Sequence, residues 1–241
     1  MLEKITNIFF PSVCPICGKI PVKGQKICEE CRKNIVIISE PKCVKCGKPL
    51  VDEHKLYCSG CGRRQHFFDK GVAVFEYSGF FRESMYRFKY DNSREYADFY
   101  AGVTARIYGK QFQEWEIDAV VPVPIHKERE LKRGYNQARV FAEALVKHTG
   151  LHMESRLLIR KKKTVPQKEL TEEMRYRNLK DAFAVNKEKM RGIENILLVD
   201  DIYTTGSTVD ACSSILKKAG AKRVYVLCIS AGKDVESCRN S

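Results

Sequence analysis

The fold is decided by the stretch Ile196-Leu197-Leu198-Val199-Asp200-Asp201-Ile202-Tyr203-Thr204-Thr205-Gly206-Ser207-Thr208. Four β-forming residues in a row are typical of a strand that is buried on both faces of a parallel sheet. Ligands bind at the carboxyl ends of such strands, which is where Asp200 and Asp201 stand. Gly206 then lets the backbone approach a ligand, and residues 209–219 are expected to continue as a helix. The stretch therefore predicts a buried strand followed by a phosphate-binding loop at a helix N-terminus.

The order of acids and hydroxyls in this stretch indicates what the ligand is. Phosphate accepts hydrogen bonds from hydroxyls and amides, whereas the hydroxyls of a ribose donate to carboxylates. We expect Asp200 and Asp201 to bind the ribose of a phosphorylated sugar, and its phosphate to be bound by Thr204, Thr205, Gly206, Ser207 and Thr208. Turn capping by the two acids is the alternative, although capping would not require the whole array. Over its entire length the stretch resembles the phosphoribosyl-diphosphate (PRPP) binding motif of type I phosphoribosyltransferases.

Eight cysteines near the N-terminus form four C-x-x-C pairs. The two thiolates of such a pair can face one tetrahedral ion, and four thiolates complete a structural zinc site. Because residues 14–31 realign on residues 43–61, we expect two zinc ribbons, each with its own Zn2+. The first site would comprise Cys14, Cys17, Cys28 and Cys31, and the second Cys43, Cys46, Cys58 and Cys61. Crossed pairing remains open, while disulfide or redox chemistry fits four such pairs less well in a chain without an export signal.

Two modules are expected in the 241 residues, which are 44% hydrophobic and 10% aromatic and therefore globular. Residues 1–65 form the double zinc ribbon with a short amphipathic N-terminal helix, and metal supplies much of its folding free energy. Residues 66–241 form an α/β domain, a mostly parallel sheet flanked by helices. His54 and His66 are expected on the surface, since eight thiolates already satisfy two ions. The longest apolar runs fall far short of the roughly 18 residues of a membrane span, so a cytoplasmic location is expected.

A second strand-and-loop unit precedes the first in the chain. Residues 118–124 predict a buried strand that stops at proline, and residues 126–137 predict a loop rich in hydrogen-bond donors. Arg133 suits bidentate contact with phosphate and Gly134 gives backbone freedom, so we assign this pair to the pyrophosphate of the sugar. A solvated basic loop is the alternative. The following helix is expected to cover residues 135–147.

Positive charge is concentrated in one part of the chain. The net charge is +13, and residues 126–192 hold 18 Lys and Arg against 9 Asp and Glu. A diphosphate sugar needs only a few of these cations, so the surplus indicates a polyanionic partner such as nucleic acid. Single-stranded DNA is expected to stack on Tyr135 or Tyr176 and to be bound through its phosphates by Arg160, Lys161, Lys162 and Lys163. A charged surface hairpin is the alternative.

Several motifs together resemble the ComF family of competence proteins. They are Val121-Pro122-Val123-Pro124, Arg133-Gly134-Tyr135-Asn136-Gln137, Pro166-Gln167, Arg175 with Asn178, the phosphate loop and the paired cysteines. The resemblance implies a type I phosphoribosyltransferase-like fold and a bacterial protein of DNA uptake in natural transformation, which works beside a helicase-like competence ATPase. The segment after Arg160 corresponds in phosphoribosyltransferases to a flap that shields the reaction from water.

Two functions remain open from the sequence. One is an accessory protein of DNA uptake that binds PRPP for sensing or structure. The other is an active pentosyltransferase that displaces pyrophosphate from PRPP, with Mg2+ offsetting the charge of the diphosphate. No side chain indicates the acceptor, so catalytic residues are left unassigned.

The repeated cysteine pairs predict two zinc ions per chain. Metal quantification on purified protein with reduced cysteines should give two, because each ion needs four thiolates and the chain offers two sets of four. One ion or none would reject the grouping into two sites.

Overall fold

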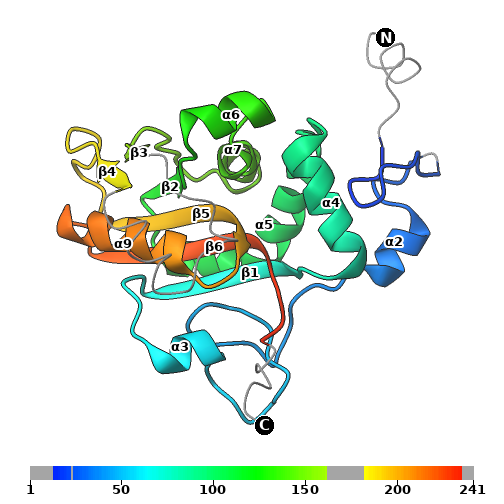
Figure 1. The fold of residues 1–241 in the computed structure, drawn as a ribbon, viewed down its shortest axis with the longest axis horizontal. Coiled ribbons are helices and arrows are strands. Elements are labelled where there is room, and N and C mark those ends of the chain that lie inside the picture. The colour runs from blue at the N-terminus through cyan, green and yellow to red at the C-terminus, as the bar shows by residue number, and fades with distance from the viewer. Residues whose placement is uncertain (1–12, 23, 162–181, 235–241) are drawn as a thin grey trace.

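The computed structural model describes residues 13–22, 24–161 and 182–234. A four-stranded sheet lies between helices, and the cysteine-rich segment lies beside the sheet at β1 (Figure 1). The strands are β1 (Lys70–Glu76), β2 (Ala119–Pro122), β3 (Leu158–Arg160), β4 (Phe183–Val185), β5 (Asn195–Tyr203) and β6 (Arg223–Ala231). The helices are α2 (Glu29–Asn34), α3 (Ser59–Arg63), α4 (Gly79–Tyr90), α5 (Tyr96–Glu114), α6 (Lys127–Arg133), α7 (Gln137–Thr149) and α9 (Ser207–Lys218).

The main sheet has the strand order β1-β6-β5-β2, and each neighbouring pair is parallel. β5 is an inner strand that pairs with β6 along its length and with β2 from Ile196 to Val199. Because the strands are parallel, their carboxyl ends meet at one end of the sheet, which is where the expected phosphate loop follows β5. The predicted fold class, an α/β fold with a mostly parallel sheet flanked by helices, is confirmed. β3 and β4 form a separate antiparallel pair.

Apolar side chains on the two faces of the sheet form two cores. On one face, Leu197 packs with residues of α4, α5 and α7. On the other face, Leu198 packs with residues of α9. Burial on both faces explains the unbroken apolar run with which β5 begins. Phe81, Met85 and Phe88, which recur at helical spacing, are buried on α4.

The segment between β2 and α7 differs from the expected loop. Residues 127–133 form α6, and the amide of Glu128 donates to the ring of His126 at its N-terminus. The helix ends at Gly134, whose φ is 81°. Because Leu131 is the only apolar residue of α6, the sequence has no hydrophobic period from which this helix could be predicted. α7 begins two residues later than expected, since Asn136 caps it by accepting a hydrogen bond from the amide of Ala138.

The two ribbons lie on opposite faces of the sheet. Cys14 and Cys31 of the first ribbon belong to the core formed with α4 and α5, whereas Cys43 and Cys46 of the second belong to the core formed with α9. In Figure 1 the two accordingly stand apart, with α2 beside α4 and α3 beyond β1. The boundary expected at residue 65 remains a proposal, because both cores extend across it. The helix expected in residues 2–10 lies outside the described residues.

Residues 36–38 connect the two ribbons and pair with the edge strand β1. The amide of Ile38 donates to the carbonyl of Val74 at 2.8 Å, and the amide of Glu76 donates to the carbonyl of Val36 at 2.9 Å. The pairing is antiparallel and covers the side of β1 that faces away from β6. The chain thus passes from one face of the sheet to the other along an edge that would otherwise expose unpaired backbone groups.

Replacing Ile38 by proline should lower the melting temperature of the zinc-loaded protein. The change removes the amide that bonds to Val74 and costs about 1–3 kcal/mol, because the buried carbonyl loses its partner. Ile38→Ala, measured alongside, separates the loss of the buried side chain from the loss of the amide. If Ile38→Pro melts no lower than Ile38→Ala, the edge pairing does not stabilise the protein.

Candidate functional site

Two acidic side chains stand at the carboxyl end of β5, as the sequence predicts. Asp201 forms an ion pair with Lys89 of α4, with 2.9 Å between Nζ and Oδ2. Both side chains are mostly buried, with 16% of Lys89 and 18% of Asp201 exposed. The sequence does not point to Lys89, because a lysine one residue after a core phenylalanine carries no motif of its own. The lysine adds a positive charge where a sugar phosphate is expected.

Asp200 lies beside this pair in a poorly solvated position. Burial, together with the negative charge of Asp201, raises the pKa of Asp200 to about 7. The backbone amide of Asp201, which donates to Oδ1 of Asp200 at 2.9 Å, acts in the opposite direction, as do the charges of Lys89 and Arg160. Near neutral pH the carboxyl group therefore exists in both protonation states, and a ligand that donates hydrogen bonds favours the ionised one.

Arg160 ends β3 and differs in placement from the exposed basic run that the sequence predicts. Its guanidinium lies over the ring of Phe183, 5.0 Å from the centroid. Burial and the nearby charge of Arg129 lower its pKa, while Asp200 raises it, so the three groups share one electrostatic environment. This brings Arg160 toward the acids, with Arg129 near it. Lys161 is exposed, and Lys162 and Lys163 lie outside the described residues.

The phosphate loop follows β5 and leads into α9. Gly206 has a φ of 77°, and a Cβ at this position would collide with the hydroxyl of Tyr203. Both the backbone conformation and the close contact therefore require glycine. The hydroxyls of Thr205 and Ser207 lie 2.9 Å apart in a hydrogen bond. Thr204 is exposed, and Thr208 lies in the first turn of α9. The loop thus brings hydroxyl groups to the amino end of a 12-residue helix, a geometry that suits an anion.

The phosphate loop contacts the second ribbon and the residues directly after it. Arg64 donates from Nη2 to the carbonyl of Thr205 at 2.8 Å. The hydroxyl of Tyr203 lies next to Cys46, and burial, followed by the charge of that cysteine, raises the pKa of the tyrosine. Tyr203 therefore contacts both Gly206 of the loop and Cys46 of the second cluster.

His66 is buried, so its expected surface position is wrong. Only 1% of its side chain is exposed, and the ring stacks on Phe68 with centroids 4.8 Å apart. Its Nδ1 lies 3.3 Å from Oδ1 of Asp210 in α9, and the same carboxylate oxygen accepts from the amide of Phe67 at 2.7 Å. The residues after the second ribbon are thus joined to the helix that begins at the phosphate loop.

The sequence Arg133-Gly134-Tyr135-Asn136-Gln137 joins α4, α6 and α7. The hydroxyl of Tyr135 donates to the carbonyl of Phe88, and the side chain of Asn136 donates to the carbonyl of Val123 at 3.0 Å. Arg133 donates to Gln137 at 3.0 Å, and Gln137 in turn donates to the carbonyl of Lys89 at 3.5 Å. Arg133 is thus linked to Asp201 through Gln137 and Lys89.

Stacking of a base on Tyr135, expected from the sequence, is excluded by its position. Only 4% of the residue is exposed. The ring is enclosed by Phe88, 5.8 Å away between centroids, and by the guanidinium of Arg94, 4.7 Å from its centroid. Tyr176, the other expected stacking residue, lies outside the described residues.

The eight paired cysteines lie in two clusters, and the sulfurs within each are within 4.8 Å of one another. The clusters are Cys14, Cys17, Cys28 and Cys31, and Cys43, Cys46, Cys58 and Cys61, which is the sequential grouping and not the crossed one. The Sγ atoms of Cys17 and Cys28 are 3.6 Å apart, and those of Cys46 and Cys58 are 3.7 Å apart. Tetrahedral zinc with bonds of about 2.3 Å requires about 3.8 Å between sulfurs. The donor sets therefore fit structural zinc, which would hold each ribbon together without taking part in a reaction.

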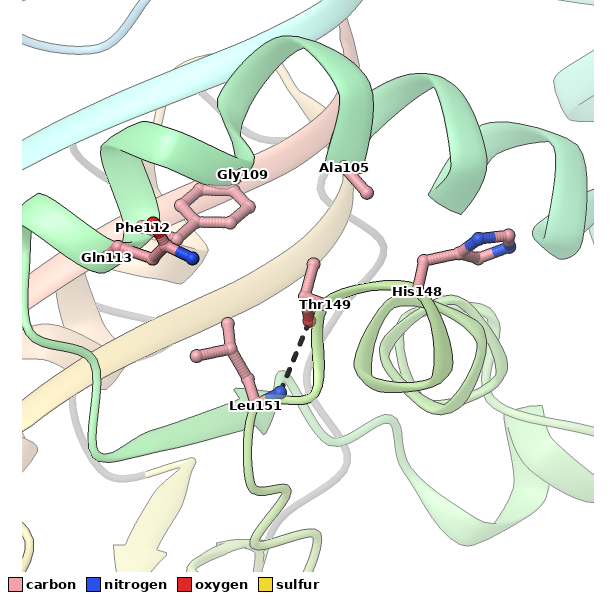
Figure 2. Close-up of a pocket in the computed structure, with 7 residues that line it drawn as sticks. All are labelled: Ala105, Gly109, Phe112, Gln113, His148, Thr149 and Leu151. Carbon is pink, nitrogen blue, oxygen red and sulfur yellow. Dashed lines mark hydrogen bonds between the residues drawn. The ribbon is translucent and has the colours of Figure 1, made fainter.

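A cavity of about 140 Å³ lies between α5 and the end of α7 (Figure 2). It is lined by Ala105, Gly109, Phe112, Gln113, His148, Thr149 and Leu151. His148 bonds to Asp98 at 2.8 Å, and Lys26 of the first ribbon lies 3.6 Å from the same carboxylate. His148 and Thr149 thus have structural partners, and we assign no chemistry to the cavity. Within the described ranges, no helix combines the length and apolar character needed to cross a bilayer.

The protein thus combines two zinc-ribbon-like cysteine clusters with an α/β domain that has acids and a hydroxyl loop at the carboxyl end of its parallel sheet. Residues 5–62 match the family model described as "Double zinc ribbon domain". Competence protein F of Haemophilus influenzae is 31% identical over 229 residues, which cover 90% of this chain and 96% of that protein. The chain therefore belongs to the ComF family of competence proteins.

Further relatives carry related names. The DNA utilization protein YhgH of Escherichia coli K12 is 27% identical over 227 residues, covering 91% of this chain and 96% of the relative. Competence protein ComFC of Bacillus subtilis is 28% identical over 210 residues, covering 83% and 82%. Among solved structures, a glutamine PRPP amidotransferase of B. subtilis complexed with ADP and GMP is 21% identical, with a TM-score of 0.36. That alignment covers 55% of this chain and 26% of the solved one.

Asp200→Asn should raise the melting temperature of the ligand-free protein more at pH 8 than at pH 5. The pKa of Asp200 is higher in the folded protein than its ordinary value of 3.8, so its contribution to stability is present at low pH and is lost as the pH rises through about 7. The asparagine carries no charge at either pH. A gain of a few degrees is expected, since about 1 kcal/mol shifts the melting temperature of a chain of this size by roughly 2–4 °C.

Glu114→Gln is the matched control. Its side chain is 62% exposed and 4.0 Å from Lys110, so its effect should be small at both pH values. An equal gain for Asp200→Asn at pH 5 and pH 8 would contradict the desolvation of this carboxyl group.

Proposed function

We propose that this protein serves DNA uptake or utilization by binding PRPP at the carboxyl end of β5 and single-stranded DNA elsewhere on its surface. Support for the biological role comes from its family, whose relatives are named for competence and for DNA utilization. A helicase-like competence ATPase is the protein partner that we propose for it. The double zinc ribbon is structural in this proposal.

The observation that carries the PRPP proposal is the arrangement around Asp200 and Asp201. Two carboxylates that accept hydrogen bonds stand directly before a loop of donors at a helix N-terminus, and Lys89 places a cation between them and α4. Hydroxyls of a ribose require acceptors, and its phosphates require donors and cations, so the two halves of the ligand match the two halves of the site. Mg2+ would accompany the diphosphate and offset its charge.

The ligand also suits the electrostatics of the site. A ribose hydroxyl that donates to Asp200 replaces the hydrogen bonds of water that burial has removed, and the phosphates bring negative charge near Lys89, Arg129 and Arg160. In the proposal, Arg133 and Gly134, which stand at the end of α6, bind the pyrophosphate. The hydroxyls and amides of residues 204–208 bind the monophosphate.

A transferase is the second candidate. In that reaction an acceptor nucleophile bonds to C1 of the ribose while the C1–oxygen bond to pyrophosphate breaks, and the leaving diphosphate keeps the electron pair. Lys89 and the two arginines would stabilise its charge. The observation in favour is that cations, acids and donor loop lie at the same end of the sheet.

Replacing both acids by alanine should abolish measurable PRPP binding in the presence of Mg2+. Each lost acceptor costs about 1–3 kcal/mol, because a ribose hydroxyl in the complex is left without a partner. Isothermal titration calorimetry on wild type, Asp200→Ala/Asp201→Ala and the control Glu114→Ala measures the effect, with thermal melting to verify the fold. Equal affinities of the three proteins would overturn the assignment of the acids.

The same preparations can separate the two candidate functions. Labelled PRPP is incubated with nucleobases, amines and single-stranded DNA, and release of pyrophosphate is followed. Release that depends on both acids and on one acceptor establishes the transferase, while tight binding without release establishes the accessory protein.

A further inference from the structure

Helix α4 carries a row of large side chains on the side away from the core. Arg82, Tyr86 and Tyr90 follow one another at intervals of four residues and therefore lie along one stripe of the helix. Tyr86 is 60% exposed and Tyr90 is 52% exposed. Their rings are 4.9 Å apart between centroids and tilted by 47°. Two adjacent aromatic rings are thus open to solvent on a helix whose opposite side is fully packed.

Guanidinium groups lie over rings at both ends of the row. The guanidinium of Arg133 is 5.3 Å from the centroid of Tyr90, and its Nη2 lies 3.5 Å from the hydroxyl of that tyrosine. Arg82 is 5.7 Å from the ring centroid of Tyr77, which precedes the helix. We call these five residues the tyrosine stripe. Contacts with arginine fix the orientation of the Tyr90 ring and reduce the entropy lost when a ligand stacks on the exposed pair.

The charge around the tyrosine stripe is positive. Helices α4 and α6 together hold seven Lys and Arg residues against three Glu residues. Glu83 forms an ion pair with Arg87 at 3.4 Å, so its charge is partly balanced. Glu128 and Glu130 lie on α6, and Asp91 follows the last residue of α4. Arg133 lies over the ring of Tyr90, and Arg82 lies on the same side of α4 as Tyr86, so cations adjoin the two rings and favour a polyanion that also has flat apolar faces.

We infer that the tyrosine stripe is the surface on which single-stranded nucleic acid stacks its bases. The inference rests on the proposed binding of single-stranded DNA and names the site for it. Bases of a duplex hide their faces from side chains, whereas those of a single strand stack on exposed tyrosines, and a nearby arginine meets the phosphates. The span from Arg82 to Tyr90 is about 12 Å along the helix, longer than one base, so a strand fits it better than a mononucleotide.

The placement also keeps the strand apart from the two acids proposed for the ribose. Lys89 precedes Tyr90 in the chain, yet its side chain reaches Asp201, whereas Tyr90 is exposed beside Arg133. A strand on the tyrosine stripe therefore lies on another side of the end of α4 from the two acids, and Arg133, which is also assigned to the pyrophosphate, is shared between the two sites.

The test compares two labelled probes in fluorescence anisotropy titrations. One is a thymidine homopolymer, and the other is an abasic strand of equal length that has the same phosphates but no bases. Wild type should bind the first more tightly. Tyr86→Ala and Tyr90→Ala should each weaken binding of the homopolymer about five- to hundredfold and leave binding of the abasic strand unchanged. Tyr86→Phe and Tyr90→Phe should retain the affinity, because the ring alone stacks.

Two further variants complete the design. Tyr57→Ala removes a tyrosine that is 50% exposed in the second ribbon, and it should leave both affinities unchanged. Arg82→Ala should weaken both probes and reduce the slope of log affinity against log salt by about 0.7, the value for one phosphate on a single strand. Melting temperature and zinc content verify that each variant is folded.

Four results would overturn the inference. Equal binding of the homopolymer and the abasic strand by wild type would show that bases contribute nothing, although the proposed function would stand. Unchanged homopolymer affinity in both alanine variants would place the strand elsewhere. Loss of self-association in those variants, with DNA binding intact, would make the face a protein interface. If wild type binds neither probe, the DNA-binding part of the proposed function fails together with the inference.

Discussion

Backbone pairing between residues 36–38 and the outer side of β1 is the constraint on which the arrangement of the molecule depends. A parallel sheet with an exposed edge strand would offer unpaired amides and carbonyls to any extended chain. The connecting segment covers that edge and at the same time places one ribbon on each face. Each cysteine cluster packs into the core on its own face of the sheet. Ribbons that are too small to form a core of their own are thus stabilised by the cores of the sheet.

A small set of charges lies in a poorly solvated position at the carboxyl end of the sheet. Asp200, Asp201 and Lys89 lie at the carboxyl end of β5, and Arg160 and Arg129 extend the cationic side. Repulsion between the two acids and their removal from water disfavour the ligand-free ionised state, and a ligand with donors on one side and anionic oxygens on the other relieves both. The same features that cost stability in the free protein thus favour the complex.

Sequence patterns predicted those parts of the molecule that a local period or spacing determines. The strand and loop at residues 196–208, the paired cysteines and the core stripe of α4 belong to this group. Lys89 and His66 were missed because their positions follow from contacts with Asp201 and Asp210, more than a hundred residues away in the chain. α6 was missed because its single apolar residue gives no period. Tyr135 was assigned to stacking because composition does not reveal burial.

The different surroundings of the two ribbons bear on how a duplicated segment can change. The first ribbon is held partly through its backbone, since Ser84 donates to the carbonyl of Pro15 and Arg87 to that of Ile16 at 3.0 Å. These hydrogen bonds do not depend on the identity of the side chains at residues 15 and 16, although the side chain of Ile16 is itself buried in the core. The second ribbon is tied to the phosphate loop through Cys46 and Tyr203, and through Arg64 just beyond it. A substitution in the second ribbon can therefore disturb the phosphate loop directly, whereas one in the first ribbon acts on the core beside α4.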